Sequence, residues 1–379
     1  MVFALLACTS VWFAGNAVIE GIQIDLSLPD NALGPITSAL QLGFIFGALL
    51  FAILTISDRY SPSKVFFVSA LTAATTNAML LVISGGYEVV LVLRFATGFC
   101  LAGIYPVGMK ITADYFPQGL GKALGILLGA LVLGTASPHL LRAIMEDLPW
   151  RYVIVVTSLI AALGGLLVLL FVKDGPNRKA ASTPDLTAFF SVFKKADFRA
   201  AAFGYFGHMW ELYAFWAFIP VFLMFYAEKN ALQLPTSMLS FSIIGIGALA
   251  CIAGGYWAVR KGSARVAAVA LVISGLCCLL SPFIFQLSLI PFLIVLFIWG
   301  LTVIADSPQF STLIAQTAPR ESVGTALTIV NSIGFFITII TIQGLNYFAT
   351  HVDPMYLFLP LTLGPVFGLI SMRRLFDSR

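Results

Sequence analysis

Long apolar stretches follow one another along almost the whole chain, separated by short polar gaps. Each stretch holds roughly 20 residues, the length that an α-helix needs to cross the hydrocarbon core of a bilayer. Backbone groups in lipid must pair within their own segment, so each stretch is predicted to be a helix. The pattern predicts about twelve membrane spans. They are placed at 2–22, 34–57, 65–84, 88–112, 121–143, 152–172, 199–226, 236–259, 264–286, 289–316, 322–350 and 354–372.

Composition supports the membrane interpretation. Hydrophobic residues make up 60% of the 379 positions, charged residues 10%, and the mean hydropathy is +0.99. A soluble chain of this composition could not cover its own surface with polar groups. The net charge of +4 would fit a nucleic-acid partner, but the charges lie in the gaps between apolar stretches. We expect the lipid bilayer as a partner and no nucleic acid.

The positions of lysine and arginine predict the orientation, because cytoplasmic loops carry an excess of both. Alternate gaps hold most of these residues, from Arg59 and Lys64 to Arg373 and Arg374. The opposite side carries only Arg142, Arg151 and Lys229. We therefore expect a multi-pass protein of the cytoplasmic (inner) membrane with both termini in the cytoplasm.

The longest gap divides the chain near its middle, which predicts an N-terminal six-helix bundle at 1–172 and a C-terminal one at 199–379. The gap itself, 173–198, is interpreted as a cytoplasmic linker. Within it, Thr183-Pro184 is typical of a helix start, and apolar residues then recur at helical spacing beside Lys194 and Lys195. This pattern indicates an amphipathic helix on the inner leaflet.

Short motifs recur at one offset, which indicates an internal duplication. Three pairs of motifs, each separated by about 200 positions, are Thr37-Ser38-x-Leu40 with Thr236-Ser237-x-Leu239, Gly47-Ala48-Leu49 with Gly247-Ala248-Leu249, and Pro106 and Pro117 with Pro308 and Pro319. Two repeated halves around a central substrate site are typical of secondary transporters. The sequence therefore predicts two pseudo-symmetric six-helix bundles.

Two segments resemble motifs of the major facilitator superfamily. The run from Asp58-Arg59 to Lys64, after the second span, is similar to its G-x-x-x-D-R-x-G-R-R loop, although Leu54 and Ser61 replace the glycines and Pro62-Ser63-Lys64 stands at the basic pair. Arg94 with Gly98 is similar to its R-x-x-x-G pattern in the fourth span. The resemblance implies an all-α membrane protein of bacterial type, with Asp58 and Arg59 as a cytoplasmic gate. Alternatively, these two residues simply end a helix.

A looser similarity links the chain to the nitrate/nitrite porter branch of that superfamily. It rests on Tyr115-Phe116-Pro117 and the following Gly121, Gly125, Gly129 and Gly134. Members of that branch place an anion-binding arginine in the second and eighth spans, and neither span contains an arginine in this chain. The resemblance therefore assigns no substrate.

Ionisable residues inside spans are costly and mark functional sites. Arg94 falls in the fourth span, His208 and Glu211 share a face of the seventh, and Asp306 falls in the tenth. The resemblance implies that these spans line the cavity. A carboxylate shielded from water favours its protonated form and can carry a proton. Our hypothesis is that Glu211 or Asp306 couples transport to protons, with Arg94 or His208 modulating it; the alternative is a structural ion pair between helices.

Aromatic and amide side chains in the same spans are candidates for the substrate site, because aromatic rings can stack on an organic solute. The alternative is that single aromatic residues face lipid. The candidate substrate-binding residues are Trp12, Asn16, Tyr205, His208, Trp210, Gln309 and Asn331.

The pattern favours a proton-coupled secondary transporter of a small organic solute that works by alternating access. A carrier of inorganic or small organic anions, similar to nitrate or nitrite carriers, is the first alternative, and a non-transporting membrane sensor is the second. The three histidines lie on separate segments and form no metal or nucleophile pattern, so no enzyme activity, cofactor or metal is expected. We expect a monomer; uptake and export stay open.

Overall fold

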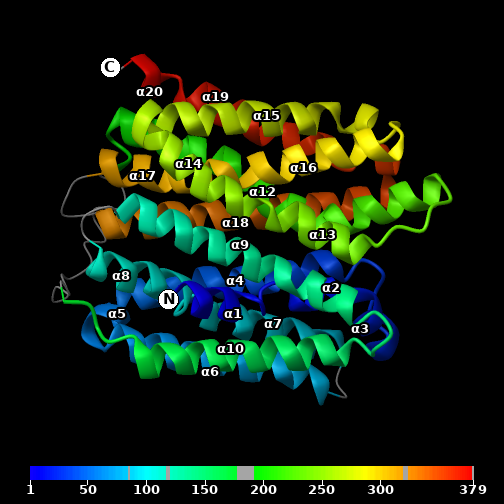
Figure 1. Ribbon diagram of the computed structural model, residues 1–379, viewed down its shortest axis with the longest axis horizontal. Coiled ribbons are helices and arrows are strands. Elements are labelled where there is room, and N and C mark those ends of the chain that lie inside the picture. The colour runs from blue at the N-terminus through cyan, green and yellow to red at the C-terminus, as the bar shows by residue number, and fades with distance from the viewer. Residues whose placement is uncertain (84–85, 117–119, 177–191, 319–322, 378–379) are drawn as a thin grey trace. The chain divides into compact units, whose positions relative to one another are not determined.

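The computed structural model describes residues 1–83, 86–116, 120–176, 192–318 and 323–377 (Figure 1). The elements in these ranges are helices, and none of the described residues lies in a strand. Within the described residues, eleven helical stretches, some of which comprise two consecutive elements, are long and apolar enough to cross a membrane. The all-α membrane fold predicted from the hydrophobic pattern is confirmed.

The chain divides into two compact units. Unit 1 comprises Met1–Thr183 with Ser237–Phe241, and unit 2 comprises Pro184–Thr236 with Ser242–Arg379. The helices of unit 1 are α1 (Val2–Thr9), α2 (Ala14–Ala17), α3 (Ile19–Leu26), α4 (Leu33–Ile53), α5 (Ile56–Arg59), α6 (Pro62–Ala78), η1 (Met79–Leu81), α7 (Tyr87–Leu101), α8 (Tyr105–Tyr115), α9 (Leu120–Ile144) and α10 (Arg151–Phe171). Most of the predicted linker helix lies outside the described residues.

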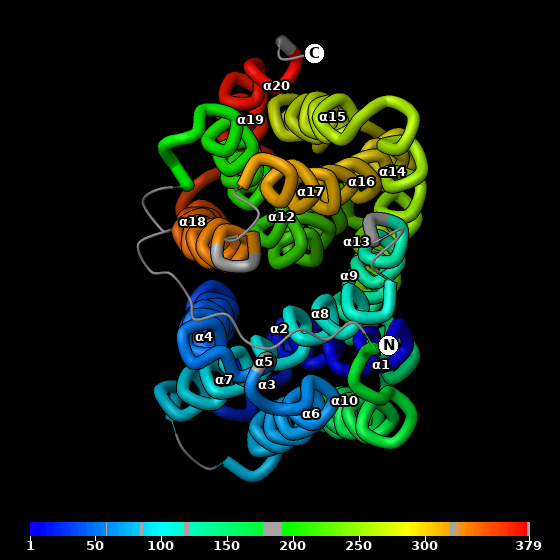
Figure 2. Tube along the Cα trace, turned by 90° about the vertical axis from the view of Figure 1, so that its left-hand side faces the viewer, coloured from blue at the N-terminus to red at the C-terminus, as the bar shows by residue number. Residues whose placement is uncertain are grey.

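Unit 2 contains the longest of the described helices, α12 (Ala196–Lys229), and shares α13 (Thr236–Gly245) with unit 1. Its other elements are α14 (Gly247–Lys261), α15 (Ser263–Ile284), α16 (Leu289–Ala305), α17 (Ser307–Thr317), α18 (Val323–His351), η3 (Pro354–Tyr356), η4 (Leu359–Thr362), α19 (Leu363–Met372) and α20 (Arg374–Asp377). Figure 2 looks nearly along the helices and shows α12 among α16, α17, α18 and α19.

Close helix packing repeats in the two halves of the sequence. A Cβ on Gly98 of α7 would collide with the carbonyl of Leu40 on α4, and one on Gly300 of α16 would collide with the carbonyl of Ile243 on α13. Gly98 and Gly300 are 202 positions apart, and Leu40 and Ile243 are 203 apart. Small residues let helix backbones approach in membranes. The same contact at the same offset supports the duplication inferred from the motifs.

The fourth span of each half is broken at the same place. α7 ends at Leu101 before α8 begins at Tyr105, and α16 ends at Ala305 before α17 begins at Ser307. Each second helix carries a proline in its first turn, Pro106 or Pro308. Proline lacks the amide hydrogen that would continue the preceding helix, so it is favoured at such a start.

The first span of each half differs. The predicted span 2–22 is interrupted between α1 and α2, at residues 10–13, whereas the corresponding α12 runs without a break through 34 residues. Discontinuous membrane helices leave backbone carbonyls without intrahelical donors, and other groups must then pair with them. The break therefore exposes polar backbone carbonyls within an otherwise apolar bundle.

Candidate functional site

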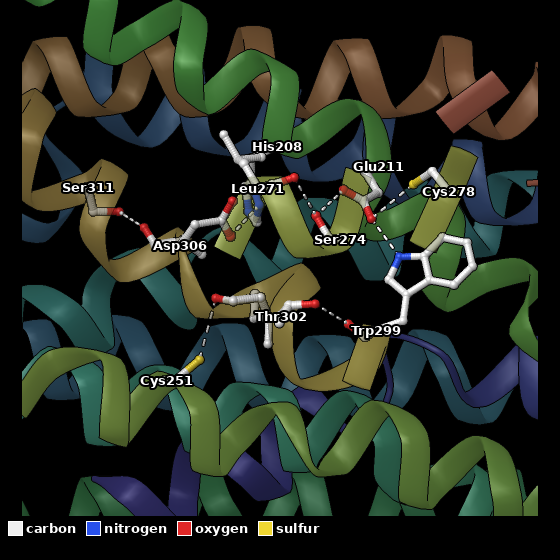
Figure 3. A network of polar contacts seen from close by, with 12 residues as sticks. His208, Glu211, Cys251, Leu271, Ser274, Cys278, Trp299, Thr302, Asp306 and Ser311 are labelled. Carbon is white, nitrogen blue, oxygen red and sulfur yellow. Dashed lines mark hydrogen bonds and ion pairs between the residues drawn. The ribbon is translucent and has the colours of Figure 1, made fainter. Parts of the chain in front are cut away.

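Two groups of buried polar side chains lie along α12 in unit 2. His208 and Glu211 are three residues apart, so both project from one face of the helix. Figure 3 shows Glu211 directed toward α15 and α16, and His208 directed toward Asp306 at the break between α16 and α17. His208, Glu211 and Asp306 are each only 1% exposed.

The first group surrounds Glu211 with hydrogen-bond donors. Trp299 Nε1 donates to Oε1 at 2.6 Å, Cys278 Sγ donates to the same oxygen at 3.3 Å, and Ser274 Oγ donates to Oε2 at 2.9 Å. Ser274 and Cys278 lie one turn apart on α15, and Trp299 lies on α16. An ionised carboxylate accepts only, and these contacts match that requirement. Glu211 therefore ties α12 to α15 and α16.

The second group is a contact between an imidazole and a carboxylate, which is an ion pair when the imidazole is protonated. His208 Nδ1 lies 2.8 Å from Asp306 Oδ1. Asp306 is the residue before α17, where the positive end of the helix dipole favours a carboxylate. A buried charge is tolerated only when it is paired, and the imidazole supplies the partner. The pair links α12 to the broken tenth span.

The imidazole ring of His208 lies beside two aromatic rings. The ring centroids of Tyr205 and Phe310 lie 5.8 and 6.0 Å from that of the imidazole. His208 Nε2 is buried and has no hydrogen-bond partner within the described ranges. A buried polar atom of this kind is unusual, because the large majority of such atoms are hydrogen-bonded.

Unit 1 holds a separate buried charge, Arg94 of α7, which is 1% exposed. Its Nη2 donates to the carbonyl of Trp12 at 2.6 Å and to that of Val11 at 3.3 Å. Its Nη1 donates to Asn77 Oδ1 of α6 at 3.1 Å and to the carbonyl of Val11 at 3.3 Å. No carboxylate of the described residues forms an ion pair with it. Arg94 therefore supplies the donors that the break between α1 and α2 leaves missing.

Polar contacts extend from this arginine through unit 1. Asn77 Nδ2 donates to Ser158 Oγ at 3.0 Å and to Thr157 Oγ1 at 3.3 Å, both on α10. Asn16 of α2 donates to Thr37 Oγ1 of α4 at 2.7 Å. The interrupted first span is thus held by α4, α6 and α7 together.

The remaining candidate substrate residues belong to both units, Trp12 to unit 1 and the others to unit 2. Trp12 is buried, with its ring centroid 5.0 Å from that of Phe44 on α4. Trp210 donates through Nε1 to the carbonyl of Pro360 at 3.1 Å, on the side of α12 that faces η4. Gln309 is buried on α17, and Asn331 is half-buried on α18. The ring of Tyr205, another of these candidates, lies beside His208, with the two centroids 5.8 Å apart.

The segment predicted as a gate lies in α5 and the start of α6. Asp58 and Arg59 belong to α5, Arg59 is exposed, and the Asp58 side chain lies outside the described part of the chain. Ser61 donates to Asp174 Oδ1 at 2.8 Å, and Ser63 donates to the carbonyl of Val172 at 2.6 Å. Two of the positions that depart from the family motif therefore fasten this loop to the end of α10.

Sequence reasoning missed the partners of the buried charges. The candidates did not include four residues that carry a hydrogen-bond donor within an apolar span: Asn77, Ser274, Cys278 and Trp299. The spacing of Ser274 and Cys278 by one helical turn is a usable signal, because it places two donors on one face.

Comparisons with known proteins found a matching family model and several similar transporters. A family model described as Major Facilitator Superfamily matches residues 1–342. The 4-hydroxybenzoate transporter PcaK of Pseudomonas aeruginosa is 30% identical over 130 residues, which is 33% of this chain and 28% of that protein. The chain spans about a third of the length of the curated relatives it matches, from 28% to 41%.

Two solved structures share the fold over nearly the full length. The nucleoside transporter NupG has a TM-score of 0.73 at 14% identity, with 99% of both chains covered. A bacterial homolog of the human lysosomal transporter Spinster, in an inward-facing and unoccupied conformation, has a TM-score of 0.72 at 15% identity, with 100% of this chain and 97% of that one covered. At these identities the likeness concerns the fold.

Proposed function

We propose that this chain, which belongs to the major facilitator superfamily, is a secondary transporter that moves a small organic solute across the cytoplasmic membrane and uses the His208–Asp306 pair to couple that movement to protons. The repeated six-helix halves and the broken spans support alternating access. The distribution of lysine and arginine supports cytoplasmic termini. The 4-hydroxybenzoate transporter among the relatives supports a small organic solute.

The observation that carries the proton coupling is the ion pair itself. Of the buried carboxylates in unit 2, Asp306 contacts a group that can exchange a proton near neutral pH, the imidazole of His208 at 2.8 Å. The pair joins α12 to the break between α16 and α17, where no continuous helix holds the backbone. A change in the charge of the pair therefore acts at the break between α16 and α17, where no continuous helix restrains the backbone.

Glu211 is the weaker candidate for the same role. Its two oxygens accept from Trp299, Cys278 and Ser274, and these are neutral side chains that donate without exchanging protons readily. Protonation of Glu211 would place a hydroxyl hydrogen beside donors, and the Ser274 hydroxyl would have to turn to accept it. We therefore assign Glu211 to helix packing and Asp306 to coupling.

The test separates solute movement from proton coupling in proteoliposomes that contain the purified protein. Counterflow exchange of labelled solute at equal pH requires binding and alternation only, whereas accumulation against a gradient requires the proton. A panel that begins with 4-hydroxybenzoate and extends to nucleosides, sugars and amino acids identifies the solute. Asp306→Asn is expected to keep counterflow and to lose accumulation driven by a pH gradient.

Two matched variants serve as controls for this experiment. Glu228→Gln removes an exposed carboxylate at the end of the same α12, and it is expected to behave as the wild type. Glu211→Gln is expected to keep proton-driven accumulation. If Asp306→Asn still accumulates solute down a proton gradient, the assignment of coupling to this pair is wrong.

A further inference from the structure

The second ring nitrogen of His208 is one of the buried polar atoms of unit 2 that have no hydrogen-bond partner among the described residues. Nδ1 is engaged with Asp306 Oδ1 at 2.8 Å. Nε2 is buried, and no donor or acceptor of the described residues reaches it. Burial of a polar atom without a partner is costly, so an atom of this kind calls for a partner such as a ligand, a proton or a water molecule.

We infer that His208 Nε2 binds the carboxylate of an organic anion, and that the proton and the anion occupy this site together. This inference rests on the proposed transport function and names its solute class. A neutral imidazole that carries its hydrogen on Nδ1, the nitrogen 2.8 Å from Asp306 Oδ1, presents a lone pair at Nε2. A proton that enters the site adds to Nε2, and the resulting N–H then has no acceptor from the described residues.

A carboxylate supplies the missing acceptor. The bond from an imidazolium N–H to a carboxylate oxygen is charge-assisted and stronger than a bond between neutral groups. One proton and one anion also add no net charge to a buried region that already holds Asp306 and Glu211. A neutral solute lacks this gain, and a cationic solute would be repelled by the imidazolium.

The ionisable groups around His208 are few, so we assign the binding of the carboxylate to its imidazole. Asp306 is its ion-pair partner, Glu211 lies one turn along α12, and the thiol of Cys251 on α14 lies near the same break, 3.8 Å from the carbonyl of Ile304. α19 carries no ionisable side chain, and those of α18 lie at its end, at Tyr347 and His351. The rings of Tyr205 and Phe310 flank the imidazole and suit an apolar or aromatic body behind the carboxylate.

Thermodynamic linkage makes the effect of the proton on anion affinity equal to the effect of the anion on proton affinity. If the anion binds only the protonated imidazole, the proton must bind more tightly when the anion is present. Symport of a proton and an organic anion then uses one ring, in which Nδ1 contacts Asp306 and Nε2 contacts the solute.

The test uses matched pairs that differ in the carboxylate alone: benzoate with benzamide, and propionate with propionamide. Binding to the purified full chain in detergent is followed by thermal stabilisation and by calorimetry between about pH 5.5 and 8, where an imidazole changes charge. For the wild type, carboxylate affinity should rise as pH falls, carboxamide affinity should stay flat, and calorimetry in two buffers should show uptake of about one proton for each anion bound.

The decisive variant is His208→Asn. Its amide nitrogen can replace the Nδ1 donor toward Asp306 but leaves nothing at Nε2, so the fold should be kept while carboxylate affinity falls about tenfold or more and loses its pH dependence. His351→Asn, an exposed histidine on α18, should match the wild type.

Three results would overturn the inference: carboxylate and carboxamide binding equally, a carboxylate preference that survives in His208→Asn, or no carboxylate that stabilises the wild type. Proton-driven accumulation of a neutral solute would also overturn it and would leave the proposed transport function standing. Failure of that function would appear instead as accumulation that ignores the pH gradient in wild-type proteoliposomes.

Discussion

The assignment of Glu211 to packing makes a prediction that separates charge from hydrogen bonding. Glu211→Gln keeps a carbonyl oxygen for Trp299 Nε1 and Cys278, and its amide nitrogen can donate to Ser274 Oγ, which accepts as well as donates. Glu211→Ala removes every acceptor and leaves a void among α12, α15 and α16. The two variants should therefore differ sharply in stability.

The magnitude follows from the three contacts. Hydrogen bonds between membrane helices average about 0.6 kcal/mol and reach about 1.7 kcal/mol. Glu211→Gln retains the contacts with weaker, neutral geometry, so a loss of about 1 kcal/mol is expected. Glu211→Ala loses all three, leaves the Trp299 indole donor without its acceptor and creates a cavity, so a loss of about 3–5 kcal/mol is expected.

The assay is unfolding of the purified protein in mild detergent, followed by tryptophan fluorescence, beside proton-driven accumulation in proteoliposomes. Trp299→Phe provides a second measure, because it removes the 2.6 Å bond but keeps an aromatic ring stacked on Phe215, whose centroid lies 4.7 Å away. The same variants at Glu228, which is exposed, control for the loss of a carboxylate. The reasoning fails if Glu211→Gln is as stable as the wild type and yet has lost proton-driven accumulation.

Three further predictions concern packing. Arg94→Lys should lower the free energy of unfolding by about 2 kcal/mol or more, because one ammonium group cannot reach all the carbonyls and the amide oxygen that the planar guanidinium contacts. Thermal unfolding is the assay, and an unchanged midpoint would contradict this prediction. Gly98→Ala and Gly300→Ala should each cost about 1–3 kcal/mol, since each Cβ meets a backbone carbonyl; Gly344→Ala, which has open space around it, is the control in the same melting series. Tyr226→Phe should cost about 1 kcal/mol by losing the 2.7 Å bond to the Leu287 carbonyl while keeping the ring stacked on Phe292, and a larger loss in chemical denaturation would contradict this.

The hydrophobic pattern predicts well which residues lie inside a membrane span, but it predicts poorly which way each helix is rotated and so which side chains meet. It placed His208, Glu211 and Asp306 inside spans, and the structure buries all three. It could not show which side chains meet, because a long span has several apolar faces and only packing selects among them. Asp306 and His208 are almost a hundred positions apart and come together through two different helices.

Helical geometry could have excluded one candidate. Trp210 was grouped with His208 as a substrate residue because both are in the same span. Residues two apart on a helix do not face the same side, and Trp210 in fact binds the carbonyl of Pro360. The break at residues 10–13 had no comparable signal, because Val11, Trp12 and Phe13 continue the apolar stretch without a proline.

The duplication adds an argument about which buried charges perform a function. In unit 1, Arg94 ties the first, third and fourth spans of its half; in unit 2, Glu211, which stands 199 positions after Trp12, ties the corresponding three spans. A polar contact that recurs at the same place in both halves, with opposite charge, is most simply a requirement of the shared scaffold.

The His208–Asp306 pair has no such counterpart. At the offsets of 199 and 202, its positions correspond to Thr9 and Ile104, neither of which is ionisable. Thr9 satisfies its hydroxyl within its own helix, on the carbonyl of Leu5 at 2.8 Å. The scaffold therefore forms without an ion pair at this place, and unit 2 carries the cost of burying one. The corresponding place in unit 1 folds without a charge, so the pair at the broken span of unit 2 is the feature on which the proposed coupling role rests.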